Sequence, residues 1–189
     1  MSFKKIIKLP IILIIIILAF NICINLMCGF FPAKYVDEIK KYSEEYSVDP
    51  YLVMAVIKAE SNFKKEAVSN KDAGGLMQIT PSTAKWLAEK IKISGFKDED
   101  VYKPEVNIKL GCYYLSYLYD MYADTDCMLA AYNAGHGTVD KWLSDSAYST
   151  DGKTLEKIPY KETEQYINKV NSYTKIYRIL YKIRMGRMV

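Results

Sequence analysis

The pattern of apolar and polar positions divides the chain into an apolar N-terminal segment and a longer amphipathic part. An apolar run covers residues 9–31 with few polar interruptions. About 20 apolar residues cross a bilayer, so this run predicts a transmembrane helix. Behind it, apolar residues recur at helical spacing, and no stretch shows the alternation typical of strands. We therefore expect an all-α domain over residues 32–184, preceded by one membrane helix, with a basic stub at 1–8 and a basic tail at 185–189.

The residues around the apolar run predict how it sits in a membrane. Lys4, Lys5 and Lys8 precede it, and no acid accompanies them. The positive-inside rule then keeps the N-terminus in the cytoplasm and exports the domain, which gives a single-pass protein of the cell membrane. Two alternatives stay open. The run could be a cleaved signal peptide, although no clear small-x-small site follows it. It could also be lipidated at Cys28, although Met27 is bulky where a small residue is expected.

The amphipathic part predicts a series of helices separated by polar loops. Asp49 and Thr80 each precede a proline, which is typical of an N-cap followed by the first helical residue. The expected helices lie at 36–46, 50–60, from 81 past Trp86 and Leu87, from 104 to Leu118, from about Asp126 to Gly135, and from Tyr160 to about Arg184. Loops are expected at 62–79, 96–103 and 144–157. The last helix carries a tyrosine stripe that we interpret as core packing.

Charge and composition exclude several classes of protein. The formal net charge is +4, but no acid precedes Asp37 or follows Glu164, so the excess positive charge lies at the two ends. The domain itself lacks the basic face of a nucleic-acid binder. The single histidine and four cysteines show no zinc-ligand spacing, and we expect neither a metal nor a cofactor. Cys112 and Cys127 fall on consecutive expected helices, where export would permit a disulfide.

Glu60 is the residue most indicative of chemistry. It ends the helix that Asp49 begins, and helical spacing places it on the apolar face with Val56 and Ile57. Burial disfavours an ionised carboxylate and raises its pKa. A carboxyl that stays protonated near neutral pH is suited to general acid catalysis. The alternative is a core glutamate paired with a buried lysine or arginine.

Several blocks around Glu60 match one family in order and spacing. They are Glu60-Ser61-Asn62-Phe63, Ala73-Gly74-Gly75-Leu76-Met77-Gln78-Ile79, Pro104-Glu105-Val106-Asn107, Ala130-Ala131-Tyr132-Asn133-Ala134-Gly135, and Ile158-Pro159-Tyr160-Lys161-Glu162-Thr163. With these blocks, residues 35–180 resemble the catalytic domain of the soluble-lytic-transglycosylase family, relatives of goose-type lysozyme. The resemblance implies an α-rich, lysozyme-like fold with a small β turn after Glu60.

The resemblance also implies roles for individual residues. Glu60 would be catalytic, and the expected substrate-binding set is Ser69, Gly75, Leu76, Met77, Gln78, Tyr132 and Asn133. The hydroxyl of Tyr132 would reach toward Glu60, and Glu162 would be a buried acid that supports the site by hydrogen bonds. Met77 could equally belong to the core. Gly74 and Thr80 depart from the family pattern, and the extra glycine could loosen the loop.

The implied activity is the cleavage of peptidoglycan glycan strands by a lyase, with one glutamate acting first as acid and then as base. The muramoyl C6 hydroxyl attacks within the same sugar, which closes a 1,6-anhydro ring and replaces a bound water. Most glycosidases use two carboxylates. The nearby candidates, Glu66 and Asp72, lie in the loop that follows Glu60. A hydrolytic muramidase and a non-catalytic peptidoglycan-binding module remain alternatives, and the biological role stays open.

Overall fold

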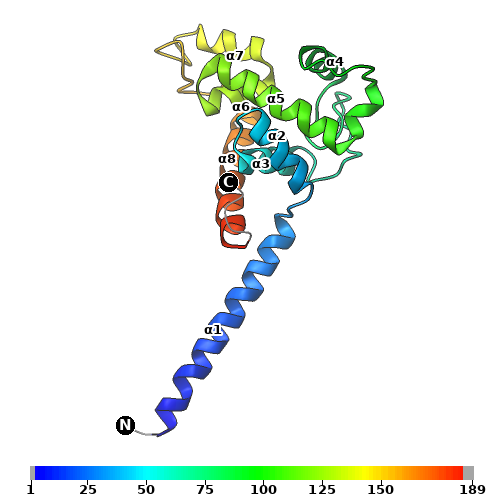
Figure 1. The fold of residues 1–189 in the computed structure, drawn as a ribbon. Helices are drawn as coiled ribbons and strands as arrows, with labels where there is room; N and C mark the ends of the chain where they lie inside the picture. Colours follow the sequence, from blue (N-terminus) through cyan, green and yellow to red (C-terminus); the bar gives the residue numbers. More distant parts are fainter. Residues whose placement is uncertain (1–2, 185–189) are drawn as a thin grey trace. The chain divides into compact units, whose positions relative to one another are not determined.

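The computed structural model describes residues 3–184 and divides into two compact units, Met1–Ala33 and Lys34–Val189. The first unit is one helix, α1 (Phe3–Phe30), which includes Pro10 (Figure 1). Its segment Pro10–Phe30 has a mean hydropathy of 2.9 and none of it is buried, so its length and composition suit a membrane span. Residues 1–2 and the predicted tail at 185–189 lie outside the part of the chain that the structure describes.

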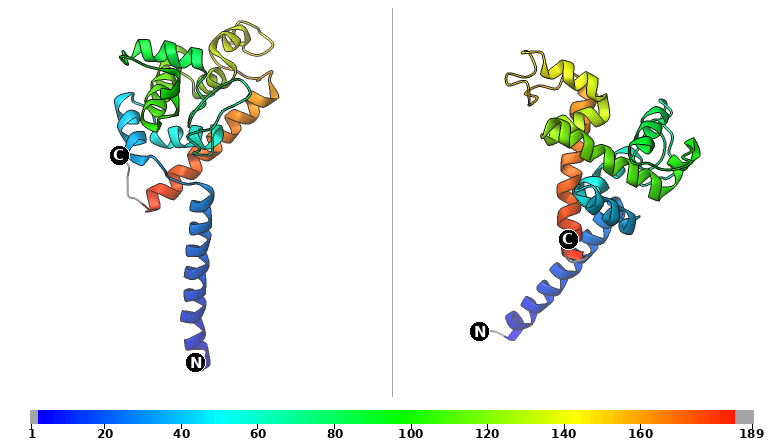
Figure 2. Two further views of the ribbon diagram at one scale, coloured as in Figure 1. Left: turned by 90° about the vertical axis from the view of Figure 1, so that its right-hand side faces the viewer. Right: turned by 45° about the horizontal axis from the view of Figure 1, so that its top comes forward.

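The second unit is built from helices, as predicted. They are α2 (Val36–Glu45), α3 (Pro50–Glu60), α4 (Pro81–Lys90), the 3₁₀ helix η1 (Asp98–Tyr102), α5 (Pro104–Tyr122), α6 (Thr125–Ala134), α7 (His136–Leu143) and α8 (Lys161–Arg184). Helix α3 packs along α8, and α5 packs against α2 and α6 (Figure 2). Within residues 3–184 the only β pairing consists of isolated bridges from Gly74 to Val68 and to Ile79, which form the expected β turn.

Side-chain caps fix where three helices begin. The backbone N–H of Tyr51 donates to Asp49 at 2.9 Å, and that of Thr83 donates to Thr80 at 3.3 Å. The predicted caps of α3 and α4 are therefore confirmed. Asp124 caps α6 by accepting from the N–H of Cys127 at 2.7 Å, so this helix begins just before the predicted Asp126.

Two segments differ from the predicted loops. Helix α7 was not predicted, because the glycines on both sides of His136 favour a loop; the burial of Val139 and Trp142 stabilises the helix instead. In the segment predicted as a polar loop at 96–103, η1 buries Val101 against the rest of the unit. Tertiary packing outweighs local propensity in both places.

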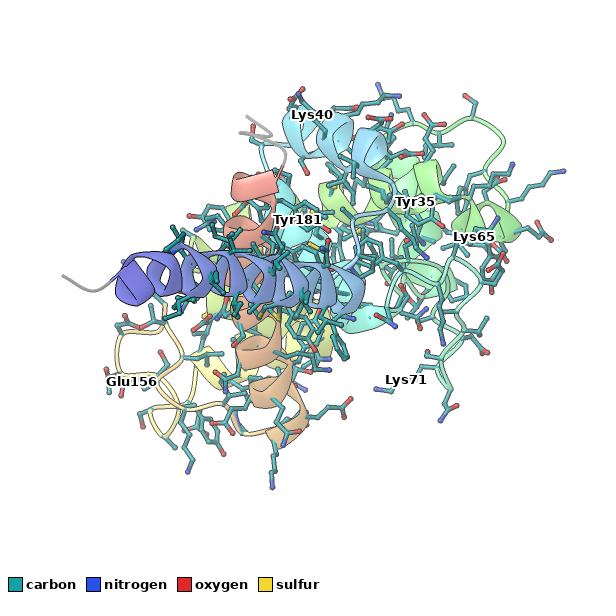
Figure 3. All side chains as sticks on the ribbon, turned by 90° about the horizontal axis from the view of Figure 1, so that it is seen from below. Tyr35, Lys40, Lys65, Lys71, Glu156 and Tyr181 are labelled. Atoms are coloured by element: carbon teal, nitrogen blue, oxygen red, sulfur yellow. The ribbon has the colours of Figure 1, made fainter. Side chains whose placement is uncertain are left out.

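The tyrosine stripe of α8 belongs to the core. Tyr166, Val170, Tyr177 and Tyr181 are buried, and Tyr173 of the same stripe is half-buried. The rings of Tyr177 and Tyr181 stack with centroids 5.8 Å apart, and Tyr181 is labelled in Figure 3. The interpretation of this stripe as core packing is therefore confirmed.

The two cysteines of the second unit are free thiols. Cys112 of α5 and Cys127 of α6 are both buried, and no disulfide joins them in the structure. Burial is the main reason that the pKa of Cys127 is raised to about 12. Both side chains therefore act as small apolar core residues.

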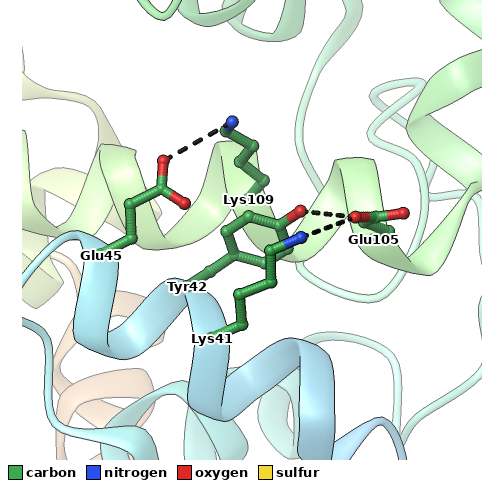
Figure 4. Close-up of polar contacts among 5 residues, drawn as sticks. All are labelled: Lys41, Tyr42, Glu45, Glu105 and Lys109. Carbon is green, nitrogen blue, oxygen red and sulfur yellow. Dashed lines mark hydrogen bonds and ion pairs between the residues drawn. The ribbon is translucent and has the colours of Figure 1, made fainter.

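Polar contacts tie α2 to α5 at the surface (Figure 4). The hydroxyl of Tyr42 donates to Glu105 at 2.7 Å, and Lys41 contacts the same carboxylate at 3.1 Å. Lys109 pairs with Glu45 at 3.5 Å. Lys41 and Glu105 are largely exposed, so their ion pair contributes little to stability.

Candidate active site

Glu60 occupies the last position of α3, after a stretch of fully buried residues that ends at Ile57. Its own side chain is only partly exposed. Burial raises the pKa of Glu60 to about 7, against smaller opposing effects from the hydroxyl of Tyr166 and the charge of Lys169. A carboxyl with this pKa exists in both protonation states near neutral pH, so it can donate a proton and later accept one.

Two tyrosines from different helices flank this carboxyl. Tyr132 of α6 donates a hydrogen bond from its hydroxyl to the main-chain carbonyl of Met77 at 2.8 Å. Burial, followed by the charge of Glu60, raises the pKa of Tyr132 well above 10. Tyr166 of α8 is buried, and burial followed by the charge of Glu60 raises its pKa too. Within the part of the chain that the structure describes, the hydroxyl of Tyr166 forms no hydrogen bond of good geometry. It is therefore available to a negative charge that develops on Glu60.

The loop after Glu60 is held in a defined shape by Gly75. This residue has a φ of +79°, and its N–H donates to the carbonyl of Ala67 at 2.9 Å. A Cβ at this position would overlap the side-chain amide of Asn107 and the carbonyl of Val101. Only glycine combines this backbone conformation with so close an approach.

Asn107 of α5 bonds two residues of this loop and one of η1, and it is fully buried. Its Oδ1 accepts from the N–H of Met77 at 2.7 Å, and its Nδ2 donates to the carbonyls of Gly74 at 3.1 Å and Val101 at 2.8 Å. Sequence reasoning did not nominate it as a site residue, although it lies in one of the blocks that match the family. A polar residue on the buried face of an amphipathic helix was the signal available.

The comparisons with known proteins address this arrangement directly. A family model described as "Transglycosylase SLT domain" matches residues 37–155, which include α3 with Glu60, the loop that follows it and α6 with Tyr132. The chain belongs to the transglycosylase SLT family. The match covers most of the second unit and leaves out α1.

Individual relatives support this assignment. The chain is 36% identical over 151 residues to the soluble lytic murein transglycosylase of Escherichia coli K12, which covers 78% of this chain and 23% of the relative. It is 34% identical over 167 residues to the membrane-bound lytic murein transglycosylase C of Pectobacterium atrosepticum, covering 77% of this chain and 47% of that protein. The chain thus spans about a quarter to a half of these relatives.

A solved structure agrees with the fold. The structure of an inactive glutamate-to-glutamine mutant of lytic transglycosylase Slt from Pseudomonas aeruginosa superposes with a TM-score of 0.72 at 32% identity. The superposition covers 84% of this chain and 26% of that one. The expectation of an α-rich, lysozyme-like fold of this family is therefore confirmed.

Within this SLT domain, two predicted substrate contacts are corrected. The side chains of Leu76 and Met77 are fully buried, so neither is accessible to a substrate. Met77 packs against Gly111, where an added Cβ would overlap its sulfur. The absence of a side chain at Gly111 is what lets α5 accept Met77, and the alternative that Met77 belongs to the core is the correct one.

Gln78 and Ser69 brace the loop of the SLT domain. The amide nitrogen of Gln78 donates to the carbonyls of Ala67 at 3.0 Å and Gly75 at 2.9 Å, which leaves its Oε1 for other partners. The hydroxyl of Ser69 accepts from two backbone N–H groups, those of Lys71 and Ala73, and its own proton remains available. The Oε1 atom of Gln78 and the hydroxyl proton of Ser69 therefore remain as groups that can bond a sugar.

The position of Gly74 does not loosen the loop. Its N–H and carbonyl both bond Ile79, and Asn107 bonds the same carbonyl. A Cβ built at Gly74 would lie 3.0 Å from Val101 and 3.1 Å from Tyr102, so the glycine is closely packed against η1.

Glu162 is not the buried acid that the resemblance implied. It is exposed in the first turn of α8, because the buried face of this helix is taken by Thr163 and Tyr166. Thr163 donates to Oδ1 of Asn133 at 2.8 Å, which joins α8 to the end of α6. The site is thus braced by a neutral pair in which Asn133 takes part, and Tyr166 supplies the group beside Glu60.

Proposed function

We propose that this SLT domain is a peptidoglycan lytic transglycosylase that cuts the β-1,4 bond between N-acetylmuramic acid and N-acetylglucosamine. The observation that carries this proposal is the partly buried carboxyl of Glu60 at the end of α3, between Tyr132 and Tyr166, in a chain of the SLT family. Substrate and reaction follow from the names of the relatives, which are lytic murein transglycosylases.

The reaction needs two proton transfers, both assigned to Glu60. The protonated carboxyl first gives its proton to the glycosidic oxygen, and the bond from that oxygen to the muramoyl C1 breaks. The C6 hydroxyl of the same muramoyl residue then bonds to C1, and the Glu60 carboxylate takes its proton. The product is a 1,6-anhydromuramoyl end, no water is consumed, and Glu60 is protonated again. Acid–base help of this kind contributes about 10² to 10⁴ in rate.

The two tyrosines serve different stages. Tyr132 donates a hydrogen bond to the carbonyl of Met77, so a lone pair of its oxygen faces the site. This lone pair stabilises positive charge that develops at C1 of the muramoyl residue. Tyr166 has an unused hydroxyl proton and lowers the pKa of Glu60. It therefore stabilises the carboxylate that exists between the two proton transfers.

The charges around Glu60 favour a lyase over a hydrolase. The charged group that shifts the pKa of Glu60 is Lys169, and no carboxylate of residues 3–184 contributes to it. Glu66 and Asp72, the acids of the neighbouring loop, are exposed. A retaining hydrolase would hold its second carboxyl about 5 Å from the first, close enough to affect this pKa.

We also assign the enzyme to a membrane. The segment Pro10–Phe30 suits one span, and one of the relatives is named membrane-bound. The lysines before the span support an orientation with the N-terminus in the cytoplasm and the SLT domain outside it, where peptidoglycan lies.

The test is to digest purified peptidoglycan with the full chain in detergent and analyse the muropeptides by mass spectrometry. Wild type should release 1,6-anhydro ends, and Glu60→Gln should be slower by about 10² or more. Glu66→Gln, which changes an exposed acid of the same loop, is the matched control and should keep the wild-type rate. Reducing ends one water heavier would indicate a hydrolase. Binding without cleavage by the folded wild type would indicate a binding module.

A further inference from the structure

A surface hollow of about 420 Å³ is formed in part by the loop that follows Glu60. Lys34, Tyr35, Phe63, Lys64, Lys65, Glu66 and Ala67 line it. Three lysines face one acid there, and Glu66 is itself 3.5 Å from Lys65 in an exposed ion pair. Among residues 3–184, neither Lys34 nor Lys64 has an acid within ion-pair distance. The hollow therefore has a positive charge that the protein leaves uncompensated.

Covalent connection places this hollow near the end of the membrane segment. The candidate span ends at Phe30, and Lys34 follows four residues later. An extended chain covers at most about 3.6 Å per residue, so Lys34 lies within roughly 15 Å of the span's end. In Figure 3, Tyr35 and Lys65 lie side by side on this surface. The linker is therefore short enough for the hollow to reach the lipid headgroups around that span.

The same hollow is continuous with the catalytic loop. The ring of Phe63 packs against Tyr177 of α8 at a centroid distance of 6.4 Å. At the other end of the lining, the carbonyl of Ala67 accepts from Gly75 at 2.9 Å and from Gln78 at 3.0 Å. A ligand held by Lys64 and Lys65 would therefore contact the segment that connects Glu60 with Gly75.

We propose that the hollow formed by Lys34, Lys64 and Lys65 binds the phosphate headgroups of anionic phospholipids and docks the loop after Glu60 on the membrane surface. Charge complementarity and the covalent nearness of the span identify this partner. The consequence is that Glu60 works on glycan strands close to the membrane. The inference rests on the membrane attachment of the proposed function and is independent of the chemistry at Glu60.

The test uses the full chain in nanodiscs of phosphatidylcholine alone or with phosphatidylglycerol, followed by hydrogen–deuterium exchange of residues 62–68. Exchange should be about fivefold slower in the anionic discs, the factor expected for one lysine at an anionic surface, and high salt should abolish the difference. Lys64→Glu/Lys65→Glu should lose the protection, and Lys64→Arg/Lys65→Arg should keep it.

A matched charge reversal elsewhere is the control. Lys153 and Lys157 are exposed in the loop that precedes α8, whose start lies about 24 Å along the helix from Tyr177. Lys153→Glu/Lys157→Glu should leave the protection unchanged. Equal exchange in both kinds of disc, or equal loss in the control, would overturn the proposal.

Activity on soluble glycan fragments, assayed in the same samples, separates the two proposals. If the glycan fragments are cleaved but exchange of residues 62–68 is not slowed by anionic lipid, only the docking proposal is overturned. If exchange is slowed but no glycan is cleaved, only the proposed enzymatic activity is overturned. A chain that fails to insert into the discs overturns the docking proposal together with the membrane anchor.

Discussion

The hydroxyl of Tyr132 donates a 2.8 Å hydrogen bond to the main-chain carbonyl of Met77, 55 residues earlier in the chain. This bond joins α6 to the loop after Glu60 and fixes the direction of the phenol oxygen. The Met77 N–H is held at the same time by Asn107 at 2.7 Å. The backbone of Met77 is therefore bonded by side chains of two helices, and both contacts hold the loop that follows Glu60.

Tyr132→Phe removes this bond without changing the ring. The carbonyl of Met77 loses a partner, which should lower the free energy of unfolding by about 1 kcal/mol. The loss of the oxygen near C1 should lower kcat by about 10², with little change in KM, because that oxygen acts on charge that develops in the transition state. Steady-state kinetics and urea denaturation measure the two effects. If Tyr132→Phe is less stable but its folded form keeps the wild-type kcat, the assigned role of the Tyr132 oxygen is contradicted.

The raised pKa of Glu60 predicts a pH-dependent stability. Its pKa rises from 4.5 to about 7 on folding, so the native state holds this proton more tightly than the unfolded chain does. This contribution is complete below about pH 4.5 and is lost as pH rises to about 7. A shift of that size corresponds to about 3 kcal/mol.

The glutamine in Glu60→Gln cannot ionise, so a comparison with wild type isolates the effect of Glu60 ionisation on stability. At about pH 8 the variant should be up to about 3 kcal/mol more stable than wild type, and at about pH 4 the two should be nearly equal. Urea denaturation at both values gives the difference. A stability gain that is the same at both pH values would show that ionisation of Glu60 is not the cause.

Asn107→Leu should be strongly destabilising. It would remove three hydrogen bonds and leave the Met77 N–H and the carbonyls of Gly74 and Val101 without these partners. We expect a loss of about 3 kcal/mol or more. Thermal unfolding is the measurement, and Asn168→Leu, at an exposed position of α8, is the control. Similar melting temperatures for both variants would contradict the central role of Asn107 in the loop.

The features that sequence reasoning predicted are local ones. The caps Asp49 and Thr80 act within a few residues of their own positions, so a pattern of short range identifies them. Glu60 could be identified as a candidate because it is the acidic residue on a helix face whose remaining positions are apolar. The bond between Tyr132 and Met77 could not be derived from spacing, since it depends on how two distant segments meet.

The errors have the same origin. Glu162 and Tyr166 lie four residues apart at the start of α8 and therefore on nearly the same side of it. The packing of this helix leaves Glu162 exposed and buries Tyr166 beside Glu60. Met77 was placed in the groove because nothing in the sequence shows that Gly111, on another helix, leaves room for it. Motif matching finds the segment, and packing decides the role of each side chain.

Two glycines allow backbone strain to be separated from steric overlap. Gly75 and Gly95 both have a positive φ, +79° and +69°, but an added Cβ meets nothing within 4 Å at Gly95. Gly95→Ala should therefore cost only the left-handed conformation, about 1 kcal/mol. Gly75→Ala adds overlap with Asn107 and Val101, so we expect a clearly larger loss of stability and a slower enzyme as the loop shifts. Urea denaturation and glycan cleavage measure both. Equal costs would mean that the loop can move away from α5, and that its close packing against Asn107 does not fix its position.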